Sequence, residues 1–253
     1  MVTLNNLHKQ YDNQIVIDDA SASFNKGEIT SIIGPNGAGK STLLSMASRL
    51  LMPDAGDVII DGKAIQDWDT SKLATRLSVL RQTNNLNMRF TVRELVAFGR
   101  FPYSKGKLTD RDQQVIDEAI EFLDLVEIKN RYTDQLSGGQ RQLAFIAMIL
   151  AQDTDYILLD EPLNNLDIRH SLQIMNTVRR LAEEKQKSVV VVIHDINFAA
   201  YYSDTIIALK QGRVVAQGGI EKIIEPKMLE SIYDTPFTVE VNQGKRSCQF
   251  LMP

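Results

Sequence analysis

The sequence predicts an α/β protein with a mainly parallel sheet, an N-terminal antiparallel β portion and an inserted helical subdomain. Three observations predict this fold. Short apolar segments alternate with helical patterns between residues 156 and 209, which is typical of parallel strands covered by helices. The apolar strand pattern of residues 29–33 runs directly into a glycine-rich loop. Residues 83–136 interrupt the alternation, because they contain helical patterns and no clear strand.

The elements follow from hydrophobic periodicity and from turn residues. Up to residue 82, the prediction is a strand containing Val2, Leu4 and Leu7, strands over 15–24 and 29–33, a helix over 40–51 that stops at the turn 53–56, and strands over 56–65 and 77–82. After the insert, the prediction is a strand over 156–159, a helix over 167–184, a strand over 188–193, a helix over 196–202 and a strand over 205–209. The tail after Gly219 is short and mixed.

The insert itself is predicted to be helical. "TVRE" at residues 91–94 has the form of a capping box, in which a threonine and a glutamate satisfy the first N–H groups of a helix over 92–100. A second helix is expected over about 110–125, with apolar residues at helical spacing: Val115, Ile116, Ala119, Phe122 and Leu123.

Composition limits the classes of function. The 253 residues are enough for a proper hydrophobic core, and we expect one domain over 1–253 with residues 83–136 inserted in it. The 28 Lys and Arg against 32 Asp and Glu give a net charge of −4, which speaks against a nucleic-acid partner. Cys248 is the single cysteine, so the chain forms no intrachain disulfide and fits a reducing cytosol. The longest apolar run, residues 189–193, is strand-sized and the N-terminus lacks a signal-peptide layout, so we expect a soluble protein that meets membranes only through partners.

"GPNGAGKST" matches the phosphate-loop pattern G-x-x-x-x-G-K-[ST], and it has a strand before it and a helix after it. The glycines allow backbone N–H groups to surround phosphate oxygens, and the helix start adds its dipole. Lys40 would supply charge to the β- and γ-phosphates, and the Ser41 hydroxyl would face Mg²⁺. The alternative, a flexible glycine turn, does not explain the context. The predicted ATP-binding residues here are Gly34, Pro35, Asn36, Gly37, Ala38, Gly39, Lys40, Ser41 and Thr42.

Several polar residues follow predicted strands. Asp160 and Glu161 end "YILLDEP", where Asp160 would hold Mg²⁺ and Glu161 would act as general base toward the attacking water. His194 is either a structural histidine or a contact to the γ-phosphate or the water. Gln82 is either an exposed strand-end residue or a group that reaches Mg²⁺ or the water. Tyr11 offers an aromatic face on which adenine could stack.

A second glycine turn, Leu136 to Gln140, begins another predicted helix, with Ser137 as its cap. Such a helix start binds anions. Because the first loop already holds the phosphates of its own subunit, we expect Ser137, Gly138, Gly139 and Gln140 to contact a nucleotide held by another copy of the chain. The alternative is an ordinary Ser-Gly-Gly helix cap.

The order and spacing of "GPNGAGKST", Gln82, "LSGGQ", "YILLDEP" and His194 strongly resemble the ABC ATPases, the nucleotide-binding subunits of ATP-driven transporters. This resemblance covers essentially the whole chain. It implies that Tyr11 stacks on adenine, that Gln82 senses Mg²⁺ and the membrane subunit, that residues 137–140 contact the partner's ATP, that Glu161 is the base and that His194 is the switch histidine.

The segment after Glu161 departs from the S-A-L-D that many members have, because it reads Leu163-Asn164-Asn165-Leu166-Asp167. Asp167, the residue of the dimer-crossing loop, remains. "EPLNNLD" and "TVRELVAFGRFPYSKGKLT" resemble the ATPases of bacterial iron–siderophore importers, which are similar to the vitamin B12 importers. The resemblance implies ATP and Mg²⁺, a homodimer, permease subunits, an extracytoplasmic substrate-binding protein as an indirect partner, and a peripheral location at the cytoplasmic face of the membrane.

Two other functions remain open from the sequence. One is a cytosolic ABC ATPase without a permease, as in iron–sulfur cluster assembly, and the other is a regulatory ATP-dependent switch. A transporter ATPase needs a groove for a short helix of the membrane subunit. The groove candidates in the insert, which are otherwise core residues of the insert, are Phe98, Arg100, Phe101 and Tyr103.

Overall fold

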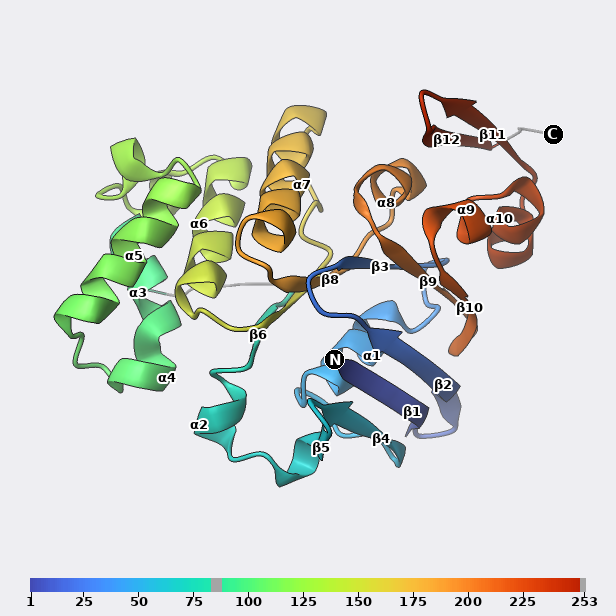
Figure 1. The fold of residues 1–253 in the computed structure, drawn as a ribbon, viewed down its shortest axis with the longest axis horizontal. Coiled ribbons are helices and arrows are strands. Elements are labelled where there is room, and N and C mark those ends of the chain that lie inside the picture. The colour runs from blue at the N-terminus through green and yellow to red at the C-terminus, as the bar shows by residue number, and fades with distance from the viewer. Residues whose placement is uncertain (83–87, 251–253) are drawn as a thin grey trace. The chain divides into compact units, whose positions relative to one another are not determined.

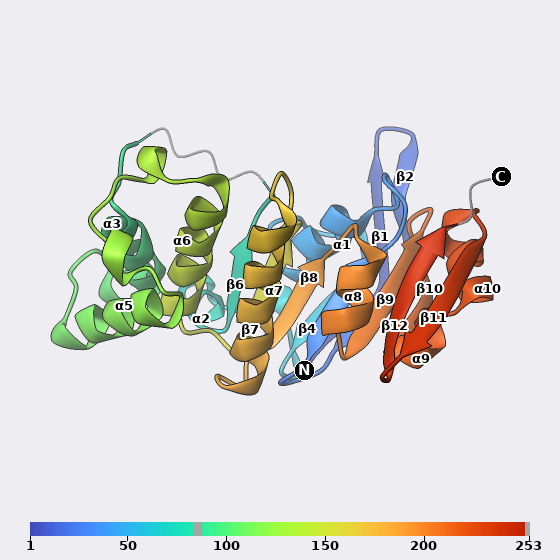
Figure 2. The ribbon, with the colours of Figure 1, turned by 90° about the horizontal axis from the view of Figure 1, so that it is seen from above.

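The computed structural model describes residues 1–82 and 88–250, and these residues fall into two compact units. Unit 1 comprises Met1–Trp68 and Arg179–Pro253, and unit 2 comprises Asp69–Val178. The first five residues of the predicted insert, 83–87, lie outside the described residues, and the rest of the insert lies within unit 2. Figures 1 and 2 show the elements of both units in two views.

Unit 1 contains the predicted antiparallel portion and a parallel group of strands. The antiparallel sheet has the order β2-β1-β4-β5, from β1 (Val2–Tyr11), β2 (Gln14–Phe24), β4 (Ala55–Ile60) and β5 (Lys63–Ala64). A second group has the order β10-β9-β3-β8, from β3 (Ile29–Ile33), β8 (Ser188–Val192), β9 (Thr205–Lys210) and β10 (Arg213–Gly218). Strand β3 runs parallel to both β8 and β9, while β10 is antiparallel to β9. All residues of β3 and β8 are buried, which explains their continuous rather than alternating apolar pattern.

The helices of unit 1 are α1 (Lys40–Ala47), α8 (Ile196–Tyr202), α9 (Ile220–Ile223) and α10 (Pro226–Tyr233). Helix α1 is shorter than the predicted 40–51, because the chain turns after Ala47. The N–H groups of Leu50 and Leu51 both donate to the Ser45 carbonyl, and Arg49 has a φ of 60°. The tail forms α9, α10 and a hairpin of β11 (Phe237–Asn242) and β12 (Lys245–Phe250).

The C-terminal hairpin belongs to the same hydrophobic cluster as α8, α9 and α10, and Figure 1 shows it beside these helices. Asn197 of α8 fixes β12 by two reciprocal hydrogen bonds. Its Nδ2 donates to the Cys248 carbonyl (3.2 Å), and the Cys248 N–H donates to its Oδ1 (2.7 Å). Burial raises the pKa of the Cys248 thiol to about 11, so this thiol is a packing group in unit 1.

Unit 2 contains two parallel strands, β6 (Leu77–Leu80) and β7 (Tyr156–Asp160), with Leu80 paired to Leu159. Its helices are α2 (Thr70–Leu73), α3 (Val92–Ala97), α4 (Phe101–Ser104), α5 (Asp110–Phe122), α6 (Gly138–Ala151) and the start of α7 (Ile168–Glu183). Helices α3, α5 and α6 pack on one another, as Figure 1 shows. The predicted capping box is present, since Glu94 accepts from the Thr91 N–H and the Thr91 side chain accepts from the Glu94 N–H.

The predicted helix over 92–100 is interrupted. After Ala97 the chain tightens into a 3₁₀ turn over Phe98–Arg100 before α4 begins. A Cβ atom at Gly99 would lie 2.1 Å from the Met148 carbonyl oxygen, so the turn brings the backbone against α6 in a way that only glycine permits. The helix predicted over 110–125 ends at Phe122.

Arg100, a groove candidate from the sequence, lies inside unit 2. Its side chain and that of Asp112 are about 7% and 5% exposed, and Nε donates to Asp112 Oδ1 at 2.9 Å. Its Nη1 donates to the Ala151 carbonyl (2.8 Å), which ties the 3₁₀ turn to α5 and α6. Phe98 and Phe101, in contrast, are 47% and 60% exposed.

Candidate active site

The phosphate loop, residues 34–42, leads from the end of β3 into the first turn of α1 in unit 1. Gly34 and Gly39 have φ values of 147° and 98°, and neither has room for a side chain. A Cβ at Gly34 would lie 2.0 Å from the Leu209 carbonyl oxygen, and one at Gly39 would lie 2.7 Å from Ile17 Cδ1. Gly37 (φ 78°) has nothing within 4 Å of its Cβ position, so only its backbone conformation requires glycine.

Lys40 is the first residue of α1 and is 5% exposed. Its Nζ donates to the carbonyl oxygens of Gly34 (2.8 Å) and Pro35 (3.0 Å), so the ammonium lies over the loop from which it emerges. Ser41 and Thr42 follow in the first turn of α1 and are partly buried, whereas Asn36 and Gly37 are exposed at the loop tip. The Lys40 ammonium and the exposed loop tip at Asn36 and Gly37 belong to the same loop, which is the arrangement by which such loops bind phosphate.

His194 leaves the sheet beside this loop. Strands β3 and β8 are parallel, Ile32 pairs with Val192, and the Ile193 N–H donates to the Ile32 carbonyl (3.2 Å). Gly34 and His194 therefore both emerge at the carboxyl edge of adjacent strands. His194 is exposed, and Asp195 after it caps α8 by accepting from the N–H groups of Asn197 and Phe198.

Tyr11 is the last residue of β1 and pairs with Gln14 across the hairpin to β2. Tyr11 is 48% exposed, and Lys9 Nζ lies 5.6 Å from the centroid of its ring. Tyr11 is therefore an exposed aromatic residue, and its stacking on adenine stays a prediction.

Unit 2 brings Gln82 and Glu161 together. The register of β6 on β7 places the residues after Leu80 beside those after Leu159. Gln82 Nε2 donates to Glu161 Oε2 at 2.6 Å, and Asn164 Nδ2 donates to the same oxygen. Glu161 has a φ of 50°, a left-handed conformation that costs a residue with a side chain about 1–2 kcal/mol. Two amide donors and this backbone conformation together fix the direction of the carboxylate.

The residues from Asp160 to Asp167 form what we call the acidic turn. Asp160 is the partly buried end of β7. Within the turn, the Asn164 N–H donates to the Glu161 carbonyl (3.3 Å), and Asn165 has a φ of 60°, which asparagine tolerates better than most residues. The two asparagines that depart from the S-A-L-D pattern therefore have separate uses, one as a donor to Glu161 and one at a left-handed position.

The second glycine turn begins α6 as predicted. Ser137 Oγ accepts from the Gln140 N–H (3.3 Å), and Gln140 Oε1 accepts from the Ser137 N–H (3.2 Å), which completes a capping box. The ring of His170 lies on Gly139, because a Cβ there would come within 2.0 Å of His170 Cδ2.

Asp167 and His170 join the acidic turn to the start of α7. Asp167 Oδ1 accepts from the His170 N–H and contacts His170 Nδ1, both at 2.8 Å. These hydrogen bonds from His170 lower the pKa of Asp167 from its ordinary value. Sequence reasoning missed His170 and Asn164. The signal for His170 was its position three residues after Asp167, where its N–H belongs to a helix start.

The donor set predicted for Mg²⁺ has suitable chemistry. Ser41, Gln82 and Asp160 offer hydroxyl, amide and carboxylate oxygens, which are the hard ligands that Mg²⁺ prefers when phosphates complete its shell. The bond from Gln82 to Glu161 uses Nε2, and the amide oxygen Oε1 takes no part in it. In the part of the chain that the structure describes, no group of three or more His, Cys, Asp or Glu side chains is arranged to hold a metal.

Residues 17–164 match the family model described as ABC transporter. The chain belongs to the ABC transporter family. Several relatives match most of its length, among them two from one organism. The petrobactin import ATP-binding protein YclP of Bacillus subtilis (strain 168) is 53% identical over 97% of this chain and 98% of its own length. The iron(3+)-hydroxamate import ATP-binding protein FhuC of the same organism is 40% identical over 94% of this chain and 90% of its own.

Solved structures agree with the ABC assignment. A dimeric post-hydrolysis state of the ATP-binding cassette MJ0796 bound to ADP and Pi has a TM-score of 0.77 and 33% sequence identity, covering 87% of this chain and 99% of that one. The predicted α/β fold of an ABC ATPase is thereby confirmed, and ATP hydrolysis is the reaction that this ABC chain performs. Among residues 1–82 and 88–250, no helix is long and apolar enough to cross a membrane.

Proposed function

We propose that the protein is the ATP-hydrolysing subunit of a bacterial ABC importer for iron–siderophore complexes, and that ATP-driven closure of a homodimer drives its membrane permease. The observation that carries the proposal is the 53% identity to a petrobactin import protein over 97% of the chain. The geometry of the phosphate loop and of the acidic turn supports it.

In unit 1, the phosphate loop binds ATP through backbone N–H groups of residues 36–42, since Pro35 has none. Lys40 exchanges its two carbonyl partners for the β- and γ-phosphates, and charge-assisted bonds make this exchange favourable. Tyr11 stacks on adenine. His194, which emerges beside the loop, contacts the γ-phosphate.

In unit 2, Glu161 is the general base that orients the attacking water and takes its proton. Gln82 and Asn164 hold one carboxylate oxygen, so the side chain points in one direction before ATP binds. As ligands of Mg²⁺ we propose Ser41 from unit 1 and Gln82 and Asp160 from unit 2, and a bound Mg²⁺ would neutralise charge on the phosphates. Ser137 to Gln140 and Asp167 act on the nucleotide held by the second copy.

The proposed partners follow from the exposed side chains of the helical segment. Phe98 and Phe101 are exposed aromatic residues in unit 2, and we assign them to the surface that receives a short helix of the permease. Arg100, which shares the 3₁₀ turn with Phe98, forms a buried ion pair with Asp112 that fixes this turn to α5. A binding protein outside the membrane would deliver the ferric chelate, and this chain would sit peripherally at the cytoplasmic face.

The central experiment replaces Glu161 by Gln, which keeps shape and hydrogen bonding but removes basicity. ATP should still bind and close the dimer, and hydrolysis should fall on the order of 10²–10⁴-fold. Gel filtration in Mg²⁺-ATP should then show a stable dimer, whereas Asp160→Asn should weaken both Mg²⁺ binding and the dimer. Hydrolysis at the parental rate, or a monomer in saturating ATP, would contradict the mechanism.

The cargo is tested separately, with the complete transporter reconstituted in vesicles. Ferric petrobactin should stimulate ATP hydrolysis, and vitamin B12 serves as the comparison ligand. If the chain does not co-purify with any multi-span permease, the cytosolic and regulatory alternatives replace transport.

A further inference from the structure

His170 connects two segments of unit 2 that are far apart in sequence. Its ring lies on Gly139 of the second glycine turn, and its Nδ1 and backbone N–H both contact Oδ1 of Asp167 in the acidic turn. The same side chain therefore contacts the start of α6 with one edge and the end of the acidic turn with another.

The His170 ring lies so close to the Gly139 backbone that no side chain would fit at position 139 without displacing the ring. A Cβ there would meet three His170 atoms, Cδ2 at 2.0 Å, Cγ at 2.4 Å and Cβ at 2.9 Å. At the neighbouring Gly138, the nearest atom is Leu166 Cδ2 at 3.5 Å, an ordinary van der Waals distance. The flat ring thus occupies the space that the missing side chain of Gly139 leaves.

We propose that His170 is a positioning residue that holds the second glycine turn and Asp167 as one rigid body. Both segments act on the nucleotide of the second copy in the function proposed above, so this inference rests on that function. By fixing the two relative to each other before the subunits meet, His170 reduces the ordering that dimer closure must perform.

The proposed role requires two properties of the imidazole, its Nδ1 atom and its flat ring. A nitrogen close to Cβ is needed to reach Asp167 while the backbone N–H of the same residue reaches it as well. A thin ring is needed because Gly139 lies against it. Phenylalanine retains the ring and loses the nitrogen, asparagine retains a donor near the Nδ1 position and loses the ring, and alanine loses both.

The experiment places these three substitutions in the Glu161→Gln chain and measures dimer dissociation in Mg²⁺-ATP by analytical ultracentrifugation. We expect His170→Ala to raise the dimer dissociation constant by about tenfold or more, which is the size of one lost hydrogen bond and its packing. His170→Phe and His170→Asn should each show part of this loss. ATP affinity of the monomer should stay within about twofold, because the phosphate loop is unchanged.

His8→Ala is the matched control. His8 also lies near an aspartate, with Nδ1 3.7 Å from Asp18 Oδ1, but it belongs to the antiparallel sheet of unit 1. It should leave the dimer constant unchanged. In the chain with Glu161 intact, His170→Ala should lower kcat at saturating ATP and change KM little, and a purely structural role would instead reduce folded protein and ATP binding together.

Two results would overturn the inference: a His170→Ala dimer as tight as its parent, or an equal loss of ATP binding by the monomer. If Glu161→Gln itself fails to dimerise, the proposed function fails and the inference falls with it. A normal Glu161→Gln dimer with an unaffected His170→Ala dimer removes the inference alone.

Discussion

Gln82 Nε2 donates a 2.6 Å hydrogen bond to Glu161 Oε2. The bond joins the second residue after β6 to the first residue after β7, and Asn164 adds a second amide to the same oxygen. Two amides of unit 2 therefore hold the carboxylate of the proposed base, Gln82 from the segment after β6 and Asn164 from within the acidic turn.

Asn164→Ala removes one of the two amides from Glu161. We expect kcat to fall by about tenfold, because a carboxylate held by fewer bonds spends less time aimed at the water. ATP affinity should not change. Steady-state hydrolysis and nucleotide titration measure the two effects. Asn165→Gly is the control, since glycine accepts the left-handed conformation of Asn165, and equal losses in both variants would show that only the turn's backbone matters.

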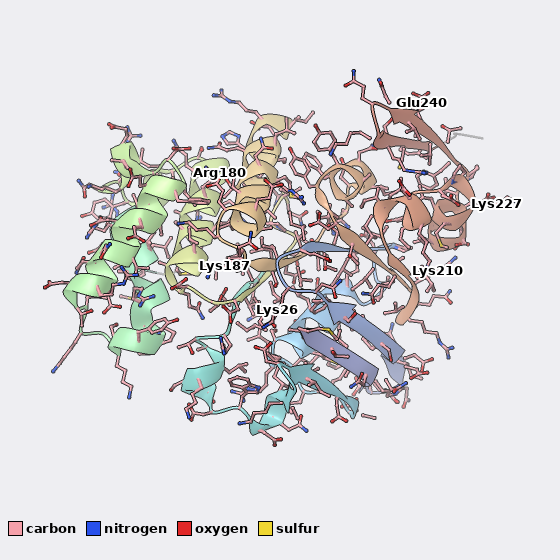
Figure 3. All side chains as sticks on the ribbon, in the orientation of Figure 1. Lys26, Arg180, Lys187, Lys210, Lys227 and Glu240 are labelled. Atoms are coloured by element: carbon pink, nitrogen blue, oxygen red, sulfur yellow. The ribbon has the colours of Figure 1, made fainter. Side chains whose placement is uncertain are left out.

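Lys40→Ala removes the ammonium from the phosphate loop. ATP affinity should fall on the order of 10²-fold, because charge-assisted bonds to two phosphates are lost. Lys26→Ala is the control, since Lys26, labelled in Figure 3, is an exposed residue of unit 1. Its Nζ pairs with Asp61 Oδ1 at 3.2 Å. Titration with a fluorescent ATP analogue decides the matter, and near-parental affinity in Lys40→Ala would remove this residue from the site.

Gly139→Ala and Gly138→Ala form a matched pair at the second glycine turn. The methyl group at 139 must displace the His170 ring, whereas the one at 138 meets only ordinary contact. We expect Gly139→Ala to reduce ATP hydrolysis at least tenfold more than Gly138→Ala, with similar ATP binding by the monomer. Adding His170→Ala to Gly139→Ala should relieve the steric effect on the melting temperature. Equal activity in the two single variants would show that the ring moves aside at little cost.

Asp112→Asn tests the buried ion pair with Arg100 through the pH dependence of the free energy of unfolding. Hydrogen bonds from the Thr109 N–H, the Thr109 hydroxyl and Arg100 lower the pKa of Asp112 to about 2. A depressed carboxyl pKa stabilises the fold above the unfolded pKa, near 4, and this stabilisation is lost as the pH falls toward 2.

The free energy of unfolding of Asp112→Asn, measured with urea, should therefore be about 2 kcal/mol lower than that of the parent at pH 7. The difference should narrow toward pH 3. Asp110→Asn, on the exposed side of the same helix start, is the control. A difference that stays constant with pH would show that the charge of Asp112 does not contribute.

Local chemistry made part of the structure predictable. The capping box of Thr91 with Glu94 and the helix cap at Ser137 both form as expected, and the structure adds a reciprocal bond from Gln140 that makes the second cap a capping box as well. The apolar run of β3 and the glycines after it are likewise a local pattern. Residues at the carboxyl ends of strands could be named in advance because parallel strands end at one edge.

Contacts between distant segments were not predictable in the same way. The break after Ala97 depends on the carbonyl of Met148, about fifty residues away in the chain, which Gly99 must approach. The burial of Arg100 depends on Asp112 and on the end of α6. The place of His170 against Gly139 likewise requires the packing of α7 near α6, and no periodicity in either segment encodes that distance.

The place of β3 in its sheet has a consequence for the speed and thermodynamics of nucleotide capture. With β8 on one side and β9 on the other, its amides should exchange with solvent only through large-scale unfolding. The phosphate loop begins at the end of β3, whose amides should exchange slowly, and Gly34, Ala38 and Gly39 of the loop are themselves buried. Most of the chain entropy of the loop is therefore lost during folding rather than on encounter with ATP. We expect hydrogen exchange of β3 to be the slowest in unit 1, and to change little when nucleotide is added.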